Sequence, residues 1–120
     1  MKKLILLFAV LMAAIVLSAP AGAEDRFGVA VYPGAKYDDA TSKYMSESLQ
    51  RTMACYRTND SLDKVAAFYR KQKGLSVRGD VLKENAHFQS DTADVALQNP
   101  WMNVISGRMM NDTLISIEKK

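Results

Sequence analysis

The sequence predicts a small α+β domain in which an antiparallel sheet of about four strands carries one or two helices on one face. Two observations lead to this class. Apolar residues recur at helical spacing in the first half of the chain beyond residue 23, and they alternate with polar residues in short segments of the second half. Helices followed by consecutive short strands are typical of α+β domains. The chain shows no internal repeat and no linker, so we expect one domain.

The first 23 residues have the order of a cleavable secretory signal. Two lysines precede an apolar run over residues 4–17, and small residues then lead to Ala23. The run is shorter than the roughly 20 residues that span a bilayer. We therefore expect cleavage after Ala23, a mature domain over residues 24–120, and a location in the periplasm or outside the cell.

The net charge falls when that signal is removed. The chain has 16 Lys and Arg against 13 Asp and Glu, a net charge of +3. Lys2 and Lys3 belong to the signal, so residues 24–120 keep 14 basic and 13 acidic side chains, a net charge of +1. These charges are interspersed and do not form the cationic stripe of a nucleic-acid-binding surface. We therefore expect no nucleic-acid partner. Because the apolar run is too short for a retained anchor, we also expect no membrane partner after signal removal.

Residues 27–32 predict a short strand that ends in a turn. The segment is apolar, β-branched and aromatic, and Pro33 and Gly34 follow it. A proline presets φ at the second position of a turn, and a glycine accepts the positive φ of the third. A type II turn is therefore expected over residues 32–35.

Residues 38–49 predict the first helix. Apolar or small side chains recur there at helical spacing, and Asp39 and Glu47 each precede a basic residue by four positions. Opposite charges at that spacing stabilise a helix. Several serines and a threonine weaken the helical propensity of the segment.

Residues 61–73 give the clearest helical pattern. Asp60 is the expected cap, with an acidic residue three positions on, and Gly74 follows two lysines near the end. The apolar stripe needs a sheet or another helix to cover it. It consists of Leu62, Val65, Ala66 and Tyr69.

Short segments of strand-like composition make up the rest of the chain. Residues 52–58 are apolar on both faces, as in a central strand. Apolar residues alternate with polar ones in residues 93–98 and share one face in residues 113–118. Residues 75–83 and 86–89 complete the predicted strands.

Three stretches carry a family resemblance. They are Val31-Tyr32-Pro33-Gly34-Ala35, the run from Cys55 to Ser61 that leads into Val65-Ala66-Ala67-Phe68-Tyr69, and the pair Pro100-Trp101. In these stretches the chain resembles a group of small exported bacterial proteins that share a Y-P-G-A segment and a T-x-D-S-x-x-x-V-x-x-F-Y helix start. The group has no assigned activity, so the resemblance implies no functional residue.

The residue inventory gives little support for catalysis or metal binding. Cys55 is the only cysteine and His87 the only histidine, which excludes an intramolecular disulfide and the usual zinc spacings. The sulfurs of Cys55, Met102, Met109 and Met110 are soft donors that suit copper(I), but methionines more often fill a core. We expect no metal and no cofactor. The catalytic alternative is a small envelope hydrolase or thiol enzyme that uses Cys55 with His87 as its base.

Residues 99–110 are the most distinctive stretch. They are apolar, are bounded by turn residues and contain the only tryptophan. One interpretation is that they cover an end of the core, with Val104-Ile105 as a strand. The other is an exposed binding patch of large, adaptable side chains. The candidate binding residues are Trp101, Met102, Met109 and Met110, with Tyr32 and Tyr56 at the border.

The absence of a catalytic constellation in the sequence favours a binding protein over an enzyme. We therefore expect a non-catalytic exported binding module. Its expected partner is a protein or a small apolar ligand whose identity the sequence does not give.

Overall fold

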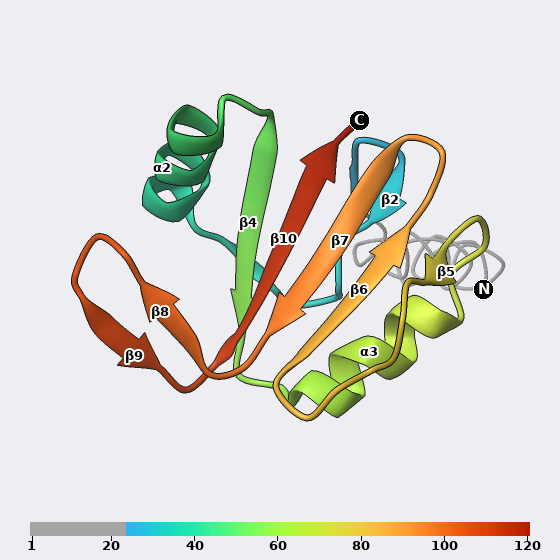
Figure 1. The fold of residues 1–120 in the computed structure, drawn as a ribbon. Helices are drawn as coiled ribbons and strands as arrows, with labels where there is room; N and C mark the ends of the chain where they lie inside the picture. The colour runs from blue at the N-terminus through green and yellow to red at the C-terminus, as the bar shows by residue number, and fades with distance from the viewer. Residues whose placement is uncertain (1–23) are drawn as a thin grey trace, which may run out of the picture.

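Residues 24–120, which the computed structural model describes, form an α+β arrangement of two helices and ten short strands (Figure 1). The signal peptide expected over residues 1–23 lies outside the described residues. The elements are β1 (Asp25–Arg26), β2 (Val29–Ala30), β3 (Lys36–Tyr37), α2 (Asp39–Leu49), β4 (Met53–Thr58), α3 (Leu62–Arg70), β5 (Ser76–Val77), β6 (Asn85–Gln89), β7 (Ala93–Gln98), β8 (Trp101–Asn103), β9 (Arg108–Met110) and β10 (Thr113–Lys119).

The main sheet has six antiparallel strands in the order β3-β4-β10-β7-β6-β5. The expectation of about four strands is therefore wrong. The four long strands were anticipated, and so was the segment of β5, although only Ser76–Val77 of the strand expected over residues 75–83 pairs in the sheet. The strand β3 was not anticipated, because two residues cannot display an alternating pattern. Two further hairpins, β1–β2 and β8–β9, lie outside this sheet.

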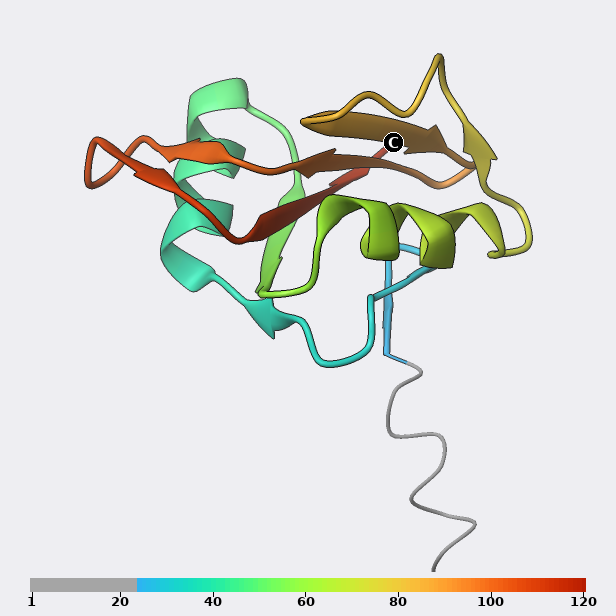
Figure 2. The same cartoon turned by 90° about the horizontal axis from the view of Figure 1, so that it is seen from below.

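One face of the sheet carries the larger core, which α3 covers. The predicted stripe of α3 is fully buried there. Figure 2 shows α3 against this side of the sheet. Alternate residues of β4, β10, β7 and β6 point into the same cluster, as the pleat requires. They are Ala54, Tyr56, Ile115, Ile117, Ala93, Val95, Leu97, Ala86 and Phe88.

The ends of α3 differ from the sequence prediction. Ser61 is the cap, since its hydroxyl accepts the N–H of Lys64 at 3.2 Å. The carboxylate of Asp60, the predicted cap, instead accepts a hydrogen bond from Tyr32. The helix ends at Arg70, three residues before the predicted end at Lys73. The turn expected over residues 32–35 is confirmed, because the N–H of Ala35 donates to the carbonyl of Tyr32 at 3.1 Å and Gly34 has φ +84°.

Helix α2 lies beside the edge of β4, so of the one or two helices expected on one face only α3 lies there (Figures 1 and 2). Two serines one helical turn apart bind the β4 backbone where β3 does not reach. The N–H of Cys55 donates to Ser42 Oγ at 2.7 Å, and the N–H of Met53 donates to Ser46 Oγ at 3.0 Å. These serines therefore occupy hydrogen-bonding positions that a neighbouring strand would otherwise fill.

This edge pairing predicts an unequal effect of serine substitutions in α2. Ser42→Ala removes the acceptor of the buried Cys55 N–H, and an unpaired buried donor costs about 1–3 kcal/mol. We expect that loss in the free energy of unfolding, measured by urea denaturation with circular dichroism. Ser48→Ala, at an exposed position of the same helix, is the control and should change stability little. Equal midpoints for both variants would contradict the edge role of Ser42.

Candidate functional site

The pleat of the β8–β9 hairpin separates the predicted binding residues into two sets. Met102 pairs with Met109, and both side chains point outward, with 52% and 55% of their surface exposed. Trp101 pairs with Met110, and both point inward; Trp101 is only 3% exposed. The expected patch that joins all four side chains is therefore wrong, because neighbouring residues of a strand face opposite sides.

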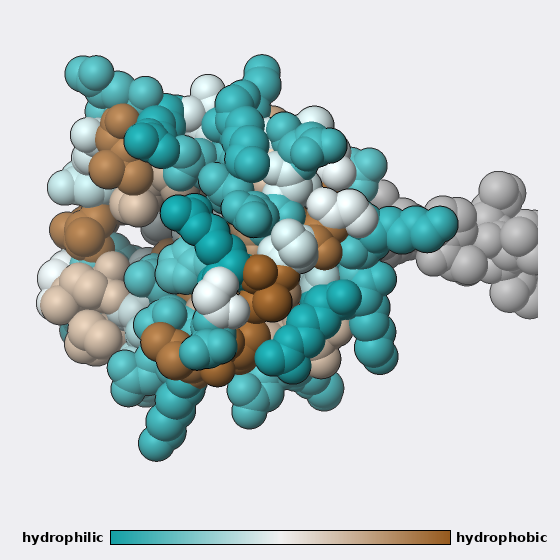
Figure 3. All heavy atoms as spheres, turned by 45° about the vertical axis from the view of Figure 1, so that its right-hand side comes forward, coloured by the Kyte–Doolittle hydropathy of each residue, from teal (hydrophilic) through white to brown (hydrophobic). Residues whose placement is uncertain are grey.

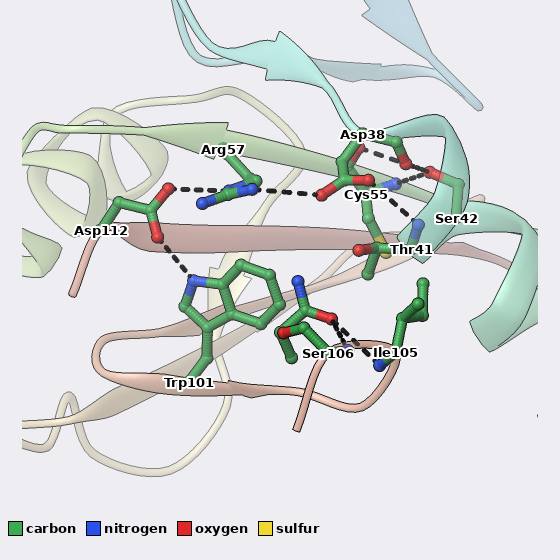
Figure 4. Close-up of polar contacts among 10 residues, drawn as sticks. Asp38, Thr41, Ser42, Cys55, Arg57, Trp101, Ile105, Ser106 and Asp112 are labelled. Carbon is green, nitrogen blue, oxygen red and sulfur yellow. Dashed lines mark hydrogen bonds and ion pairs between the residues drawn. The ribbon is translucent and has the colours of Figure 1, made fainter. Parts of the chain in front are cut away.

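Trp101 fastens the hairpin to the domain through a network that we call the Asp112 network, formed by Asp38, Arg57, Trp101 and Asp112 (Figure 4). The indole N–H of Trp101 donates to Asp112 Oδ1 at 2.8 Å. Arg57 Nε donates to Asp112 Oδ2 at 2.8 Å, and the guanidinium lies 5.1 Å from the centre of the indole ring. Arg57 also forms an ion pair with Asp38 at 3.6 Å. The base of the hairpin is thus held by a charged, half-buried cluster.

A small apolar cluster lies beneath the hairpin, on the sheet face opposite α3. It contains Cys55, Trp101 and Leu114, against which Met45 and Met110 pack. Burial raises the pKa of the Cys55 thiol, although its contact with Ser116 Oγ at 3.6 Å acts in the other direction. A buried thiol with a raised pKa is a poor nucleophile at neutral pH. Cys55 therefore has the surroundings of a structural residue.

The structure does not bring Cys55 and His87 together. The strand register places Cys55 opposite Ser116, Ser116 opposite Ala96, and Ala96 opposite His87. The two residues are therefore three strand spacings apart, about 14 Å, which exceeds the reach of a nucleophile–base hydrogen bond. The geometry gives no support to the catalytic alternative.

Residues 104–107 form the turn of the hairpin, so Val104 and Ile105 are not the strand considered in the sequence analysis. Their side chains are 48% and 53% exposed. Together with Met102 and Met109 they form what we call the apolar tip. Figure 3 shows apolar side chains at the left-hand end of the molecule, where α2 and the hairpin lie in Figure 1.

The hairpin turn satisfies its own backbone donors. Asn103 Oδ1 accepts the N–H groups of Ile105 at 3.0 Å and Ser106 at 3.2 Å. The N–H of Gly107 donates to the Asn103 carbonyl at 2.8 Å, and the N–H of Arg108 donates to Ser106 Oγ at 3.3 Å. Four consecutive amides thus find partners within the hairpin. The sequence contained the signal for this turn, since an asparagine often binds backbone groups just ahead of it and a glycine accepts positive φ.

Tyr32 and Tyr56 do not border the hairpin, which corrects the sequence expectation. Both are buried in the larger core on the face of α3. The Tyr32 hydroxyl donates to Asp60 Oδ2 at 2.5 Å, and this bond, with burial, raises the pKa of Tyr32 to about 12. The Tyr56 hydroxyl accepts a hydrogen bond from Arg26 Nε at 2.9 Å. Both tyrosine hydroxyl groups therefore form hydrogen bonds within the domain.

A polar cleft of about 660 Å³ lies next to the Asp112 network, and the sequence analysis did not anticipate it. Its wall includes Asp38, Arg57 and Asp112, together with Asp60 and Lys36. Three of the four aspartates that line the cleft already bind partners within the chain, and Asp39 is the fourth. Asp38 binds a helix N–H and Arg57, Asp60 binds Tyr32, and Asp112 binds Trp101 and Arg57. The cleft therefore offers few unoccupied charged groups to a ligand.

Comparisons with known proteins add no assignment. No protein-family model matches the chain. No curated protein matches it, and no solved structure matches it. Within residues 24–120, no three His, Cys, Asp or Glu side chains are grouped to hold a metal ion. In the same residues, no helix is both long and apolar enough to cross a membrane.

Proposed function

We propose that this chain is a non-catalytic exported binding module whose recognition element is the apolar tip of the β8–β9 hairpin. One observation carries the proposal. The hairpin buries Trp101 and packs the partly buried Met110 against the domain while leaving four large apolar side chains about half exposed. Apolar side chains gathered on a fixed, projecting element are typical of interaction surfaces.

The Asp112 network supports this function because it holds the hairpin in place. Two hydrogen bonds to Asp112 and the stacking of Arg57 on Trp101 restrain the hairpin base before any partner arrives. A fixed element loses less conformational entropy on binding than a mobile loop does. The methionines of the apolar tip still adapt their shape, since their side chains have several low-energy rotamers.

Export remains part of this proposal, with the order of residues 1–23 as its support. The exported form should begin at Glu24, which its intact mass would show. An envelope location would place the apolar tip among the proteins and lipids of that compartment. No catalytic group is required, and the separation of Cys55 from His87 agrees with that.

Site-specific photo-crosslinking in the producing cells tests the binding role. A photoreactive residue at Met109 should yield a higher-mass adduct, because this side chain belongs to the apolar tip. Val104→Asp should reduce the adduct several-fold by placing a charge in the tip. Val77→Asp is the matched control, since Val77 is 44% exposed but lies on β5 at the far edge of the sheet. No adduct at position 109, or equal adducts in both variants, would contradict the proposal.

A further inference from the structure

We propose that the partner of the apolar tip is a lipid bilayer, with the tip inserted into the boundary between headgroups and acyl chains. This inference rests on the proposed function and names the partner of the same site. It departs from the sequence expectation of no membrane partner after signal removal, because a hairpin that inserts at the surface needs no membrane-spanning segment. Interfacial insertion of this kind reaches about 5–10 Å below the headgroups.

The shape and size of the tip favour a fluid partner. Val104 and Ile105 lie in the turn, and Met102 and Met109 form a pair on one side of the projecting hairpin (Figures 1 and 2). A stable protein interface uses about 20–30 residues on each side. Four side chains on a narrow, convex element fall well below that number. Lipid acyl chains need no complementary surface, because they are fluid and adapt their conformation to an inserted side chain.

The internal hydrogen bonds of the turn favour a partner that supplies no hydrogen-bonding groups of its own. The N–H groups of residues 105–108 all have acceptors inside the hairpin. Backbone donors without partners make insertion into hydrocarbon costly, because nothing in the hydrocarbon accepts their hydrogen bonds. A protein interface, in contrast, forms about one hydrogen bond per 100–200 Å². Because these N–H groups are already hydrogen-bonded within the hairpin, moving the turn from water into lipid leaves none of them without an acceptor.

The charge of the hairpin is compatible with a phosphate-bearing surface. Residues 101–111 contain no acidic side chain, and their single charge is the exposed Arg108. Its guanidinium can remain at headgroup level while its apolar stem lies along the tip. With no anion in the hairpin, phosphate groups meet no local repulsion. A single cation adds little affinity at an anionic surface, so apolar insertion is the main source of affinity.

Vesicle flotation of the mature protein, residues 24–120, tests the inference. The probes are phosphatidylcholine vesicles and vesicles that contain one quarter phosphatidylglycerol. We expect binding to both, with Ile105→Asp lowering the partition coefficient about tenfold or more, since burial of one isoleucine side chain contributes about 1.5–3 kcal/mol. Val77→Asp should keep its binding. The emission of the buried Trp101 checks that each variant is folded.

Each other outcome overturns the lipid inference. Wild-type protein that stays with the unbound fraction excludes it, and so does binding that Ile105→Asp leaves unchanged. Binding confined to anionic vesicles and abolished by salt, with no effect of Ile105→Asp, would indicate surface electrostatics alone. A dimer in sedimentation velocity that Ile105→Asp dissociates, without flotation, would make a second copy the partner. If flotation fails while the Met109 crosslink to a protein persists, the binding module stands and only the lipid inference falls.

Discussion

Val65→Asp should leave residues 24–120 unfolded at room temperature. Val65 lies on the inner stripe of α3 with none of its surface exposed, and it packs within the larger core. The substitution removes a branched apolar side chain and places a carboxylate where the apolar neighbours offer it no counter-charge. A cavity and an unpaired buried charge together exceed about 4–5 kcal/mol. The whole stability of a domain of this size is about 5–15 kcal/mol.

Circular dichroism and thermal unfolding measure this effect directly. We expect Val65→Asp to lose its cooperative thermal transition. Lys64→Ala, one position earlier on the exposed side of the same helix, should shift the midpoint very little. Similar midpoints for the two variants would mean that the buried face of α3 has been assigned incorrectly.

The sequence predicts α3 and the long strands because each element is long enough for its apolar residues to repeat at the spacing of a helix or a strand. Four apolar positions define the α3 stripe, and all four are buried in the structure. In β7 the alternation of Ala93, Val95 and Leu97 with Asp94 and Gln98 corresponds to the observed burial. The strand β3 is too short for any such pattern, and β5 is only a short part of the strand expected over residues 75–83. Their place in the sheet depends on partners distant in the chain, such as Arg57 for Lys36.

The serines of α2 show a different limit of sequence reasoning. By intrinsic propensity they weaken a helix, and nothing local explains their presence. Their role becomes visible only when Ser42 and Ser46 are seen to bind the backbone of β4. Composition shows which polar groups a segment has, whereas tertiary structure decides which backbone groups they meet.

The grouping of Trp101 with the exposed methionines was wrong for one physical reason. The sequence singled out the stretch that forms the hairpin, and Met102 and Met109 are exposed on it. It grouped Trp101 with them because the hairpin, and hence the pleat that turns Trp101 inward, was not recognised. Asn103 and Gly107 bracket the turn and would have placed it between them. Asp112, the partner of Trp101, has no pattern of its own in the sequence.

The inward position of Trp101 makes it the residue of the hairpin with the largest expected effect on stability. Trp101→Ala should lower the free energy of unfolding by about 3–5 kcal/mol, because it empties the centre of the cluster formed with Cys55 and Leu114. It also removes the indole donor to Asp112 and the ring beneath Arg57. Met102→Ala, an outward-facing change on the same strand, should cost much less.

Trp101→Phe separates the two contributions of the indole. A phenyl ring keeps most of the packing and the stacking with Arg57 but has no N–H, so Asp112 loses one hydrogen bond and stability should fall by about 1–3 kcal/mol. Urea denaturation followed by far-ultraviolet circular dichroism measures all three variants without relying on the tryptophan signal. If Trp101→Ala retained wild-type stability but lost the Met109 crosslink, Trp101 would contact the partner directly and the anchoring role of the Asp112 network would be wrong. We expect the smallest loss of stability for Met102→Ala, a larger loss for Trp101→Phe and the largest for Trp101→Ala. That order would mean that the indole supports the hairpin from its inner side, while the outward-facing methionines remain free to bind.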